Sequence, residues 1–68
     1  MRDDVERVFG RRLRELREAQ RLTQARLAEL AGVSLKLVGA VERGEQNPSL
    51  KVLARLAAGL GVEPYELL

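Results

Sequence analysis

Apolar residues recur every three or four positions along most of this chain, which is the spacing of one face of an α-helix. The first such stripe runs through residues 3–20 and consists of Val5, Val8, Phe9, Leu13, Leu16 and Ala19. Asp3 and Asp4 stand at its start, where carboxylates favour the positive end of a helix dipole. We therefore expect a first helix over these residues, packed as a scaffold behind the two that follow.

Two short helices with well-marked ends come next. Thr23 precedes residues 24–31 and Ser34 precedes residues 35 to about 43, and each hydroxyl can accept a hydrogen bond from the free N–H groups of the first turn. Gly32 lies between them, where a positive φ lets the chain reverse. Apolar residues around each cap fit a hydrophobic staple: Leu22 with Leu27, and Val33 with Val38. This arrangement predicts a helix-turn-helix unit.

The inward faces of these two helices follow from the same spacing. The second helix is expected to bury Leu27, Ala28, Leu30 and Ala31. Ala28 suits the crossing point, because two helices that cross steeply need a small side chain where they touch. Val38 and Val41 would anchor the third helix. Gly39 lies in its middle and costs about 1 kcal/mol relative to Ala, so it indicates either a close approach to a neighbouring surface or a tolerated defect.

The last third of the chain predicts two more helices. Gly44 ends the third helix, a polar loop follows over residues 45–48, and Ser49 caps a helix from residue 50 to about 60. That helix should bury Leu50, Leu53, Leu56, Ala57 and Leu60. Gly61 ends it, and Pro64 suits the first turn of a final helix. The apolar side of that final helix would be Tyr65, Leu67 and Leu68. The fold class is therefore all-α, a compact domain of five helices over residues 1–68.

Composition narrows the function. The chain has no Cys and no His, so neither a disulfide nor a zinc site is expected. No cofactor, membrane contact, small-molecule effector or catalytic activity is indicated either. The net charge is only +2, yet residues 10–26 carry six arginines against two glutamates, a local charge of +4. Such a basic half fits a phosphate-binding face, although a solvated amphipathic helix with i,i+4 ion pairs fits it as well.

Several linked motifs resemble the lambda-repressor/Cro-like helix-turn-helix family, often called the XRE type. They are LTQ, LA, AGVS, ERG, NPS and LGV, at consistent spacing from about residue 8 to residue 68, with the helix-turn-helix motif at about 24–43. The resemblance implies a lambda-repressor-like domain that binds double-stranded DNA with a sequence preference. It further implies a transcriptional regulator, most simply a repressor, that places its third helix in the major groove as a two-fold dimer. Such a protein would work in the cytoplasm, on the nucleoid of a prokaryote or on a phage genome.

The same resemblance implies roles for individual residues. Base edges would be read from the outward face of the third helix by Ser34, Leu35, Lys36, Leu37, Gly39 and Ala40. Phosphates would be bound by Thr23, Gln24, Arg26, Arg43, Asn47, Ser49 and Lys51. In the motif, Ala28, Gly32, Val38 and Val41 form the structural core. Arg17 of the first helix would form a partly buried bidentate ion pair with Glu42 of the ERG motif.

The chain departs from the family pattern at the positions that would face DNA. Leu35, Leu37 and Ala40 stand where polar side chains are usual, and Arg26 stands where a capping-box Glu is common. Direct readout should therefore be sparse, and affinity should rest largely on phosphate contacts and DNA shape. The alternative is a protein-interaction module in which this apolar helix face binds a partner protein. A homodimer through Tyr65, Leu67 and Leu68 is also expected, unless these side chains only close the core.

Overall fold

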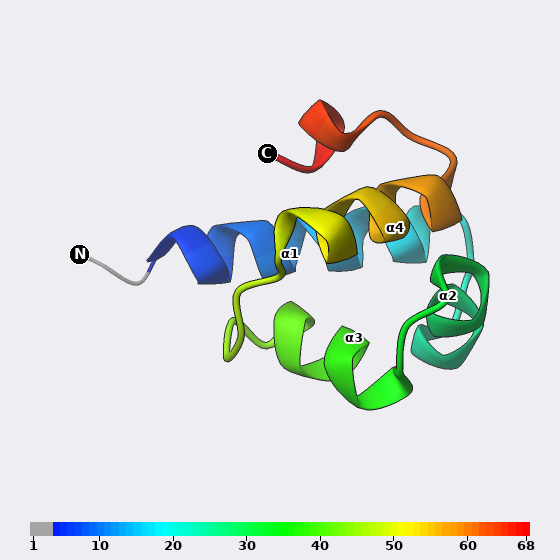
Figure 1. Cartoon of the computed structure of the whole chain (residues 1–68), viewed down its shortest axis with the longest axis horizontal. Coiled ribbons are helices and arrows are strands. Elements are labelled where there is room, and N and C mark those ends of the chain that lie inside the picture. Colours follow the sequence, from blue (N-terminus) through cyan, green and yellow to red (C-terminus); the bar gives the residue numbers. More distant parts are fainter. Residues whose placement is uncertain (1–3) are drawn as a thin grey trace.

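The computed structural model describes residues 4–68, which form helices and connecting turns with no strand among them. The helices are α1 (Asp4–Ala19), α2 (Gln24–Ala31), α3 (Leu35–Glu42) and α4 (Leu50–Leu60), followed by η1 (Pro64–Leu67). In Figure 1, α1 and α4 form the upper layer, α2 and α3 lie beneath them, and the C-terminal segment lies above. α2 packs against α3 and α4, α3 packs against α1, and η1 contacts α4 and α1.

The predicted all-α class and the positions of the four α-helices are confirmed, but the fifth helix is not an α-helix. Pro64–Leu67 is a single 3-10 turn, in which Glu66 N–H donates to Glu63 O at 2.9 Å and Leu68 N–H donates to Tyr65 O at 3.2 Å. A piece of four residues commonly takes such i→i+3 bonds, because it is too short for a run of i→i+4 bonds. Asp3, expected near the start of the first helix, lies outside the described residues.

One apolar core lies where the helices meet. It consists of Phe9, Leu13, Leu27, Ala28, Ala31, Val38, Val41, Leu56, Ala57, Leu60 and Leu67. The sequence pattern placed too many residues in this core. Val5, Val8, Leu30 and Leu50 are exposed by 78%, 58%, 45% and 86%, Ala19 is also exposed, and Leu16 and Leu53 are only half-buried. Figure 1 shows the reason for α1: its first turns extend past the helices beneath it. Within residues 4–68, Val5 and Val8 of this stripe therefore stay largely uncovered, whereas Phe9 is buried.

A glycine sets the distance between α1 and α3. A Cβ atom built on Gly10 would lie 2.7 Å from Glu42 O and still closer to Val41 O, both of them backbone atoms of α3. The two helices therefore touch backbone to backbone at this point. Gly59 likewise allows α4 to lie close to the end of α2, but the contact is less tight: a Cβ atom on Gly59 would lie 3.1 Å from Ala31 N. The sequence pattern indicated neither contact.

The end of α1 has an unusual backbone. Arg21 has φ 58°, in the left-handed region that favours glycine. Leu22 N–H donates to Arg17 O at 3.1 Å and Arg21 N–H donates to Glu18 O at 2.9 Å, which are the two bonds of a Schellman C-cap. This cap turns the chain sharply from α1 into α2 and brings Leu22 O back beside the Arg17 side chain.

Candidate nucleic-acid interface

The predicted caps of the helix-turn-helix unit are confirmed. Thr23 Oγ1 accepts a hydrogen bond from Arg26 N–H at 3.0 Å, and Ser34 Oγ accepts one from Leu37 N–H at 3.0 Å. Between the two helices Gly32 has φ 71°, as the reversal of the chain requires. Both helix N-termini therefore begin at a defined point on the surface. This places their free N–H groups where an anion can reach them.

The inner side of the unit is fully packed. Val38 and Val41 have no exposed surface, and Ala28 is only 4% exposed. Because the core joins α3 to α1 and α2, the helix has one fixed orientation. The opposite face of α3 is thus presented to the outside by a rigid scaffold rather than by a loop.

A buried ion pair ties α1 to the end of α3. Arg17 Nε donates to Glu42 Oε2 at 2.7 Å and Arg17 Nη2 donates to Glu42 Oε1 at 3.0 Å, a bidentate geometry. Arg17 Nη1 also donates to Leu22 O at 2.7 Å, and Gln24 Nε2 donates to Glu42 Oε1 at 3.0 Å. The side chains of Arg17 and Glu42 are only 11% and 3% exposed. The hydrogen bond to Glu42 raises the pKa of Arg17 against the opposing effect of burial.

The outward face of α3 is a shallow hollow with an apolar floor and polar ends. Its lining residues are Ser34, Lys36, Leu37, Ala40, Arg43, Glu45 and Gln46. Ser34, Leu35 and Lys36 are exposed, whereas Leu37 and Ala40 are half-buried and Gly39 is buried. Leu37 packs against the core, so the apolar surface available to a protein partner is smaller than the sequence indicated. Glu45 and Gln46 were not among the predicted site residues.

The residues expected at phosphates lie on both sides of this face. Thr23 and Arg26 are exposed at the start of α2, and Asn47, Ser49 and Lys51 are exposed around the start of α4. Ser49 Oγ caps α4 by accepting from Val52 N–H at 3.1 Å. Three candidates are partly engaged with carboxylates of the chain, and one of them is Arg43, whose Nε lies 3.1 Å from Glu45 Oε1. Arg26 Nη1 donates to Glu29 Oε1 at 2.7 Å, and the Gln24 amide donates to Glu42 as described above.

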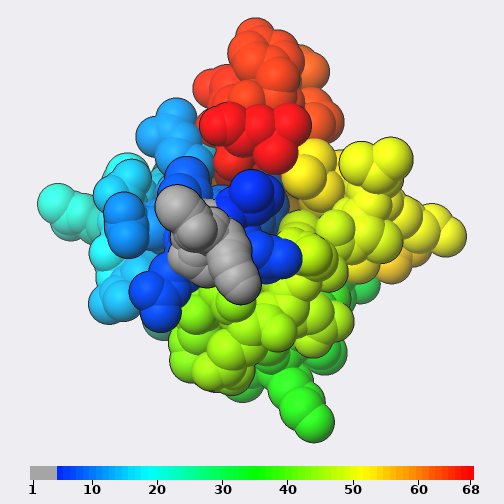
Figure 2. Space-filling view, turned by 90° about the vertical axis from the view of Figure 1, so that its left-hand side faces the viewer, coloured from blue at the N-terminus to red at the C-terminus, as the bar shows by residue number. Residues whose placement is uncertain are grey.

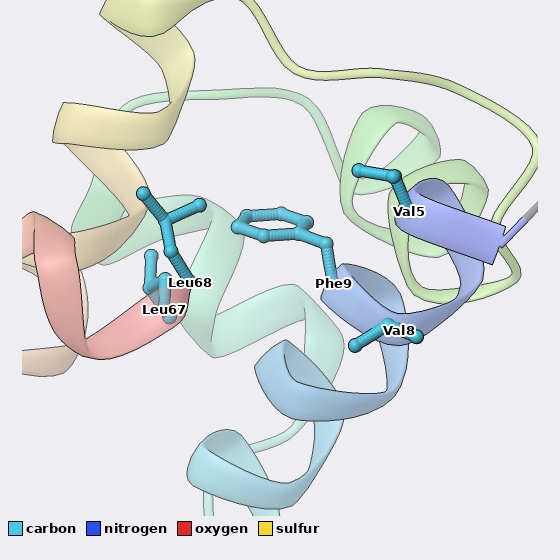
Figure 3. Close-up of a pocket in the computed structure, with 5 residues that line it drawn as sticks. All are labelled: Val5, Val8, Phe9, Leu67 and Leu68. Carbon is cyan, nitrogen blue, oxygen red and sulfur yellow. The ribbon is translucent and has the colours of Figure 1, made fainter.

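A second surface feature lies between the first turns of α1 and the C-terminal segment. An apolar groove is lined by Val5, Val8, Phe9, Leu67 and Leu68. Figure 2 shows the first turns of α1 (blue) beside the C-terminal segment (red), and in Figure 3 the Phe9 ring points toward Leu68. Leu67 itself is fully buried, so the expectation that it offers a dimer surface is wrong: it closes the core. Tyr65 and Leu68 are exposed by 73% and 83%.

Residues 4–68 contain no helix long and apolar enough to cross a membrane. Within the same span, no three side chains of the His, Cys, Asp and Glu types gather as they would around a metal ion.

Comparison with known families identifies the family of the chain. Residues 13–67 match the family described as helix-turn-helix. The chain belongs to this family. Its relatives include the immunity repressor of Bacillus phage phi105, which is 39% identical over 56 residues, covering 82% of this chain and 39% of the repressor. A second relative is the control protein C.SmaI of Serratia marcescens, which is 34% identical over 65 residues, covering 96% of this chain and 77% of that protein.

A solved structure agrees with the sequence comparison. The restriction-modification controller protein C.AhdI of Aeromonas hydrophila has a TM-score of 0.92 at 48% identity, covering 94% of this chain and 97% of the controller. The chain spans only about two fifths of the phi105 repressor and 34% of the Escherichia coli regulator SutR. Across these proteins the shared unit is the helix-turn-helix domain. Residues 13–67 of this chain therefore form a helix-turn-helix domain like those of the named repressors and control proteins.

Proposed function

We propose that this helix-turn-helix protein binds double-stranded DNA with a sequence preference by inserting α3 into the major groove, as a two-fold dimer, and that it acts as a repressor. The observation that carries the proposal is the contrast between the two faces of α3. One face is locked by Val38 and Val41, which have no exposed surface, and the other is an open hollow. A rigid helix with a free outer face suits a recognition helix.

The proposed base-reading residues are the exposed Ser34, Leu35 and Lys36, the half-buried Leu37 and Ala40, and the buried Gly39. Leu35, which is 51% exposed, can contact thymine methyl groups, whereas Lys36 and Ser34 supply the hydrogen-bonding groups near the start of the helix. Eight residues at about 1.5 Å each give a helix roughly 12 Å long, which spans about four base pairs. Direct readout by one protomer is therefore short.

Phosphate contacts would flank that short readout. The start of α2, with Thr23, Gln24 and Arg26, would bind one strand by its free N–H groups and its cation. The loop before α4 and its first turn, with Asn47, Ser49 and Lys51, would bind the other strand. Arg43 at the end of α3 is paired with Glu45 and is not counted among these phosphate contacts. Both helix N-termini are exposed, and each has its cap serine or threonine in place.

The limited reach of α3 is the reason to propose two copies. A single protomer reads about four base pairs, too few to select one site in a genome, whereas a two-fold dimer reads two half-sites about one DNA turn apart. The apolar groove, with the exposed Val5, Val8, Tyr65 and Leu68 around it, is the surface we assign to the second copy. Sedimentation of Val8→Asp and Leu68→Asp should show a monomer if this is correct. Unchanged association of both variants would reject this surface.

Salt dependence of binding tests the DNA-binding proposal. A site is first selected from random duplexes at fixed salt, and its affinity is then measured across salt concentrations. Arg26 and Lys51 give four cations per dimer, which predicts a slope of about −3.6 in a plot of log K against log salt and about a 150-fold loss from 50 to 200 mM. Arg26→Gln should reduce the slope by about 2. A flat salt dependence, or selection of no sequence, would reject the proposal.

A matched variant controls for the loss of one positive charge irrespective of its position on the surface. Arg11 is exposed on α1, the helix behind α3, and is not among the proposed contacts. Arg11→Gln removes the same charge as Arg26→Gln and should leave the slope unchanged. Equal slopes for the two variants would show that the basic residues act only through the overall charge.

A further inference from the structure

The backbone at the end of α3 fixes the positions of Arg43 and Glu45. Arg43 still has a helical backbone, with φ −82°, and Gly44 then turns the chain at φ 76°. Glu45 N–H donates back to Ala40 O at 2.9 Å and Gly44 N–H donates to Val41 O at 3.0 Å, so this is a complete Schellman cap. Both side chains therefore start from a rigid point beside the hollow.

The Arg43 side chain does not extend away from the end of the helix. It folds back by one turn, so that Nη1 lies 3.0 Å from the position that a Cβ atom on Gly39 would occupy. Gln24 Oε1 lies 3.7 Å from the same position. Gly39 thus leaves room for a guanidinium across the outer face of α3. This contact gives the mid-helix glycine a role beyond that of a tolerated defect.

Glu45 orients the guanidinium from one side. Arg43 Nε lies 3.1 Å from Glu45 Oε1, in an ion pair whose side chains are 58% and 60% exposed. The carboxylate thus occupies the Nε side of the group. Within residues 4–68 the ion pairs and hydrogen bonds of the chain leave both Nη nitrogens without an acceptor. The free edge of the guanidinium is the pair of parallel N–H donors that suits a planar acceptor pair.

We propose that Arg43 reads a guanine base from across α3, seated on Gly39 and oriented by Glu45, rather than binding a phosphate at the end of the helix. This inference rests on the proposed insertion of α3 into the major groove. Guanine presents O6 and N7 there, and a bidentate arginine is its commonest partner. The contact supplies the hydrogen-bond donors that Leu35, Leu37 and Ala40 lack.

Electrostatics favour the base over the phosphate. Glu45 places a negative charge beside Arg43 at the rim of the hollow, and that charge repels a phosphate that approaches the same guanidinium. A guanine edge has partial negative charges on O6 and N7 but no net charge, so the carboxylate repels it less than it repels a phosphate. The ion pair of Arg43 with Glu45 is exposed and therefore adds little to folding stability. Glu45 acts instead by positioning the guanidinium and by disfavouring its contact with a phosphate.

Atomic substitution of the DNA distinguishes the two roles of Arg43. The selected duplex is prepared with 7-deazaguanine at each guanine in turn, which removes N7, and separately with a neutral methylphosphonate at each phosphate. Wild-type protein should lose about tenfold in affinity at one guanine per half-site. Arg43→Ala should bind more weakly throughout and be insensitive to that substitution. Arg43→Lys should not restore the sensitivity, because an ammonium cannot make the bidentate contact.

The opposite pattern would overturn the inference. If Arg43→Ala cancels the effect of one methylphosphonate and leaves every 7-deazaguanine effect intact, Arg43 binds a phosphate and the proposed function survives without this contact. If no guanine and no phosphate couples to Arg43, the guanine contact is likewise absent and the proposed function again survives without it. If the protein selects no duplex at all, the proposed function and this inference fail together.

Two further variants test the roles of Gly39 and Glu45 in positioning Arg43. Gly39→Ala places a methyl group against Arg43 Nη1, and Glu45→Gln removes the charge that orients Arg43 Nε. Both should keep the fold, as measured by thermal unfolding, while reducing the 7-deazaguanine effect to about threefold or less. Glu45→Gln should also bind random-sequence DNA several-fold more tightly. A full tenfold 7-deazaguanine effect in both variants would show that neither residue positions Arg43.

Discussion

Replacing Gly10 with alanine tests the packing of α1 behind the recognition helix. Gly10 lies in the middle of α1 and is buried against α3. The new Cβ would stand 2.7 Å from Glu42 O and closer still to Val41 O, and these are backbone atoms that no rotamer change can move aside. The two helices must therefore separate, and the core contacts of Phe9 and Val41 must loosen with them.

The magnitude follows from two opposing effects. Alanine in place of a mid-helix glycine gains about 1 kcal/mol from helix propensity. Forcing a methyl group into a filled contact costs about 1–3 kcal/mol, and more where backbone must move. Because the clash here is with two carbonyl oxygens, we place the cost at or above the upper end. The net result is a loss of about 2 kcal/mol, which lowers the melting temperature of a domain this small by about 8–16 °C.

Gly39→Ala is the matched control for this measurement. Gly39 is also buried in the middle of a helix, so the propensity gain is the same, but its new Cβ meets only the flexible end of Arg43 at 3.0 Å. Gly39→Ala should therefore raise the melting temperature by a few degrees, at most about 8 °C. Thermal unfolding by circular dichroism, repeated with urea, compares the two variants. A Gly10→Ala variant as stable as wild type would refute the close contact of α1 with α3.

Three further predictions concern ionic contacts and backbone strain. Glu42→Gln removes the bidentate partner of the Arg17 side chain, which is 11% exposed, and leaves it, among residues 4–68, only the Glu18 carboxylate at 3.9 Å as a charged partner; it should cost about 3 kcal/mol in urea unfolding. Arg14→Gln, which breaks an exposed pair with Glu18, should cost less than about 1 kcal/mol. Because the pKa of Arg17 is raised in the folded protein, the contribution of Arg17 to folding stability is fully present below the ordinary pKa of arginine. That contribution is lost only when the pH rises above the raised pKa. The stability difference between wild type and Glu42→Gln should thus stay constant from about pH 7 to pH 10, and a marked decline within that range would contradict the assignment. Arg21→Gly should stabilise the protein by about 1 kcal/mol, because it relieves the left-handed backbone at φ 58°, and a loss of stability would show that the arginine side chain contributes more than the strain costs.

The elements that could be predicted are those encoded locally. Thr23, Ser34 and Ser49 each accept the expected hydrogen bond, because a cap depends only on a hydroxyl and the backbone three residues on. Gly32 has the expected positive φ for the same reason. The pair of Arg17 with Glu42 joins residues 25 positions apart. It was expected from the family resemblance and not from spacing.

Features that depend on how helices end and meet were not predictable from the pattern. The apolar stripe of α1 continues through Val5 and Val8, but whether those turns are covered depends on how far α3 and η1 reach. Gly10 is an ordinary glycine in the sequence and shows its importance only when α3 lies against it. Arg21 adopts a conformation that the residue type disfavours, because two backbone hydrogen bonds and the packing of Leu22 enforce it.

Contact with DNA at the outer face of α3 is the central claim, and cross-saturation in solution measures it most directly. Irradiating the protons of the selected duplex attenuates the amide signals of the protein residues that lie against the DNA. It reports contact with DNA rather than dimer formation. We expect attenuation at the start of α2, along residues 34–40 and in the loop before α4, with none at Val8 or Leu68. Attenuation centred on the groove of α1 and η1, with α3 unaffected, would contradict it.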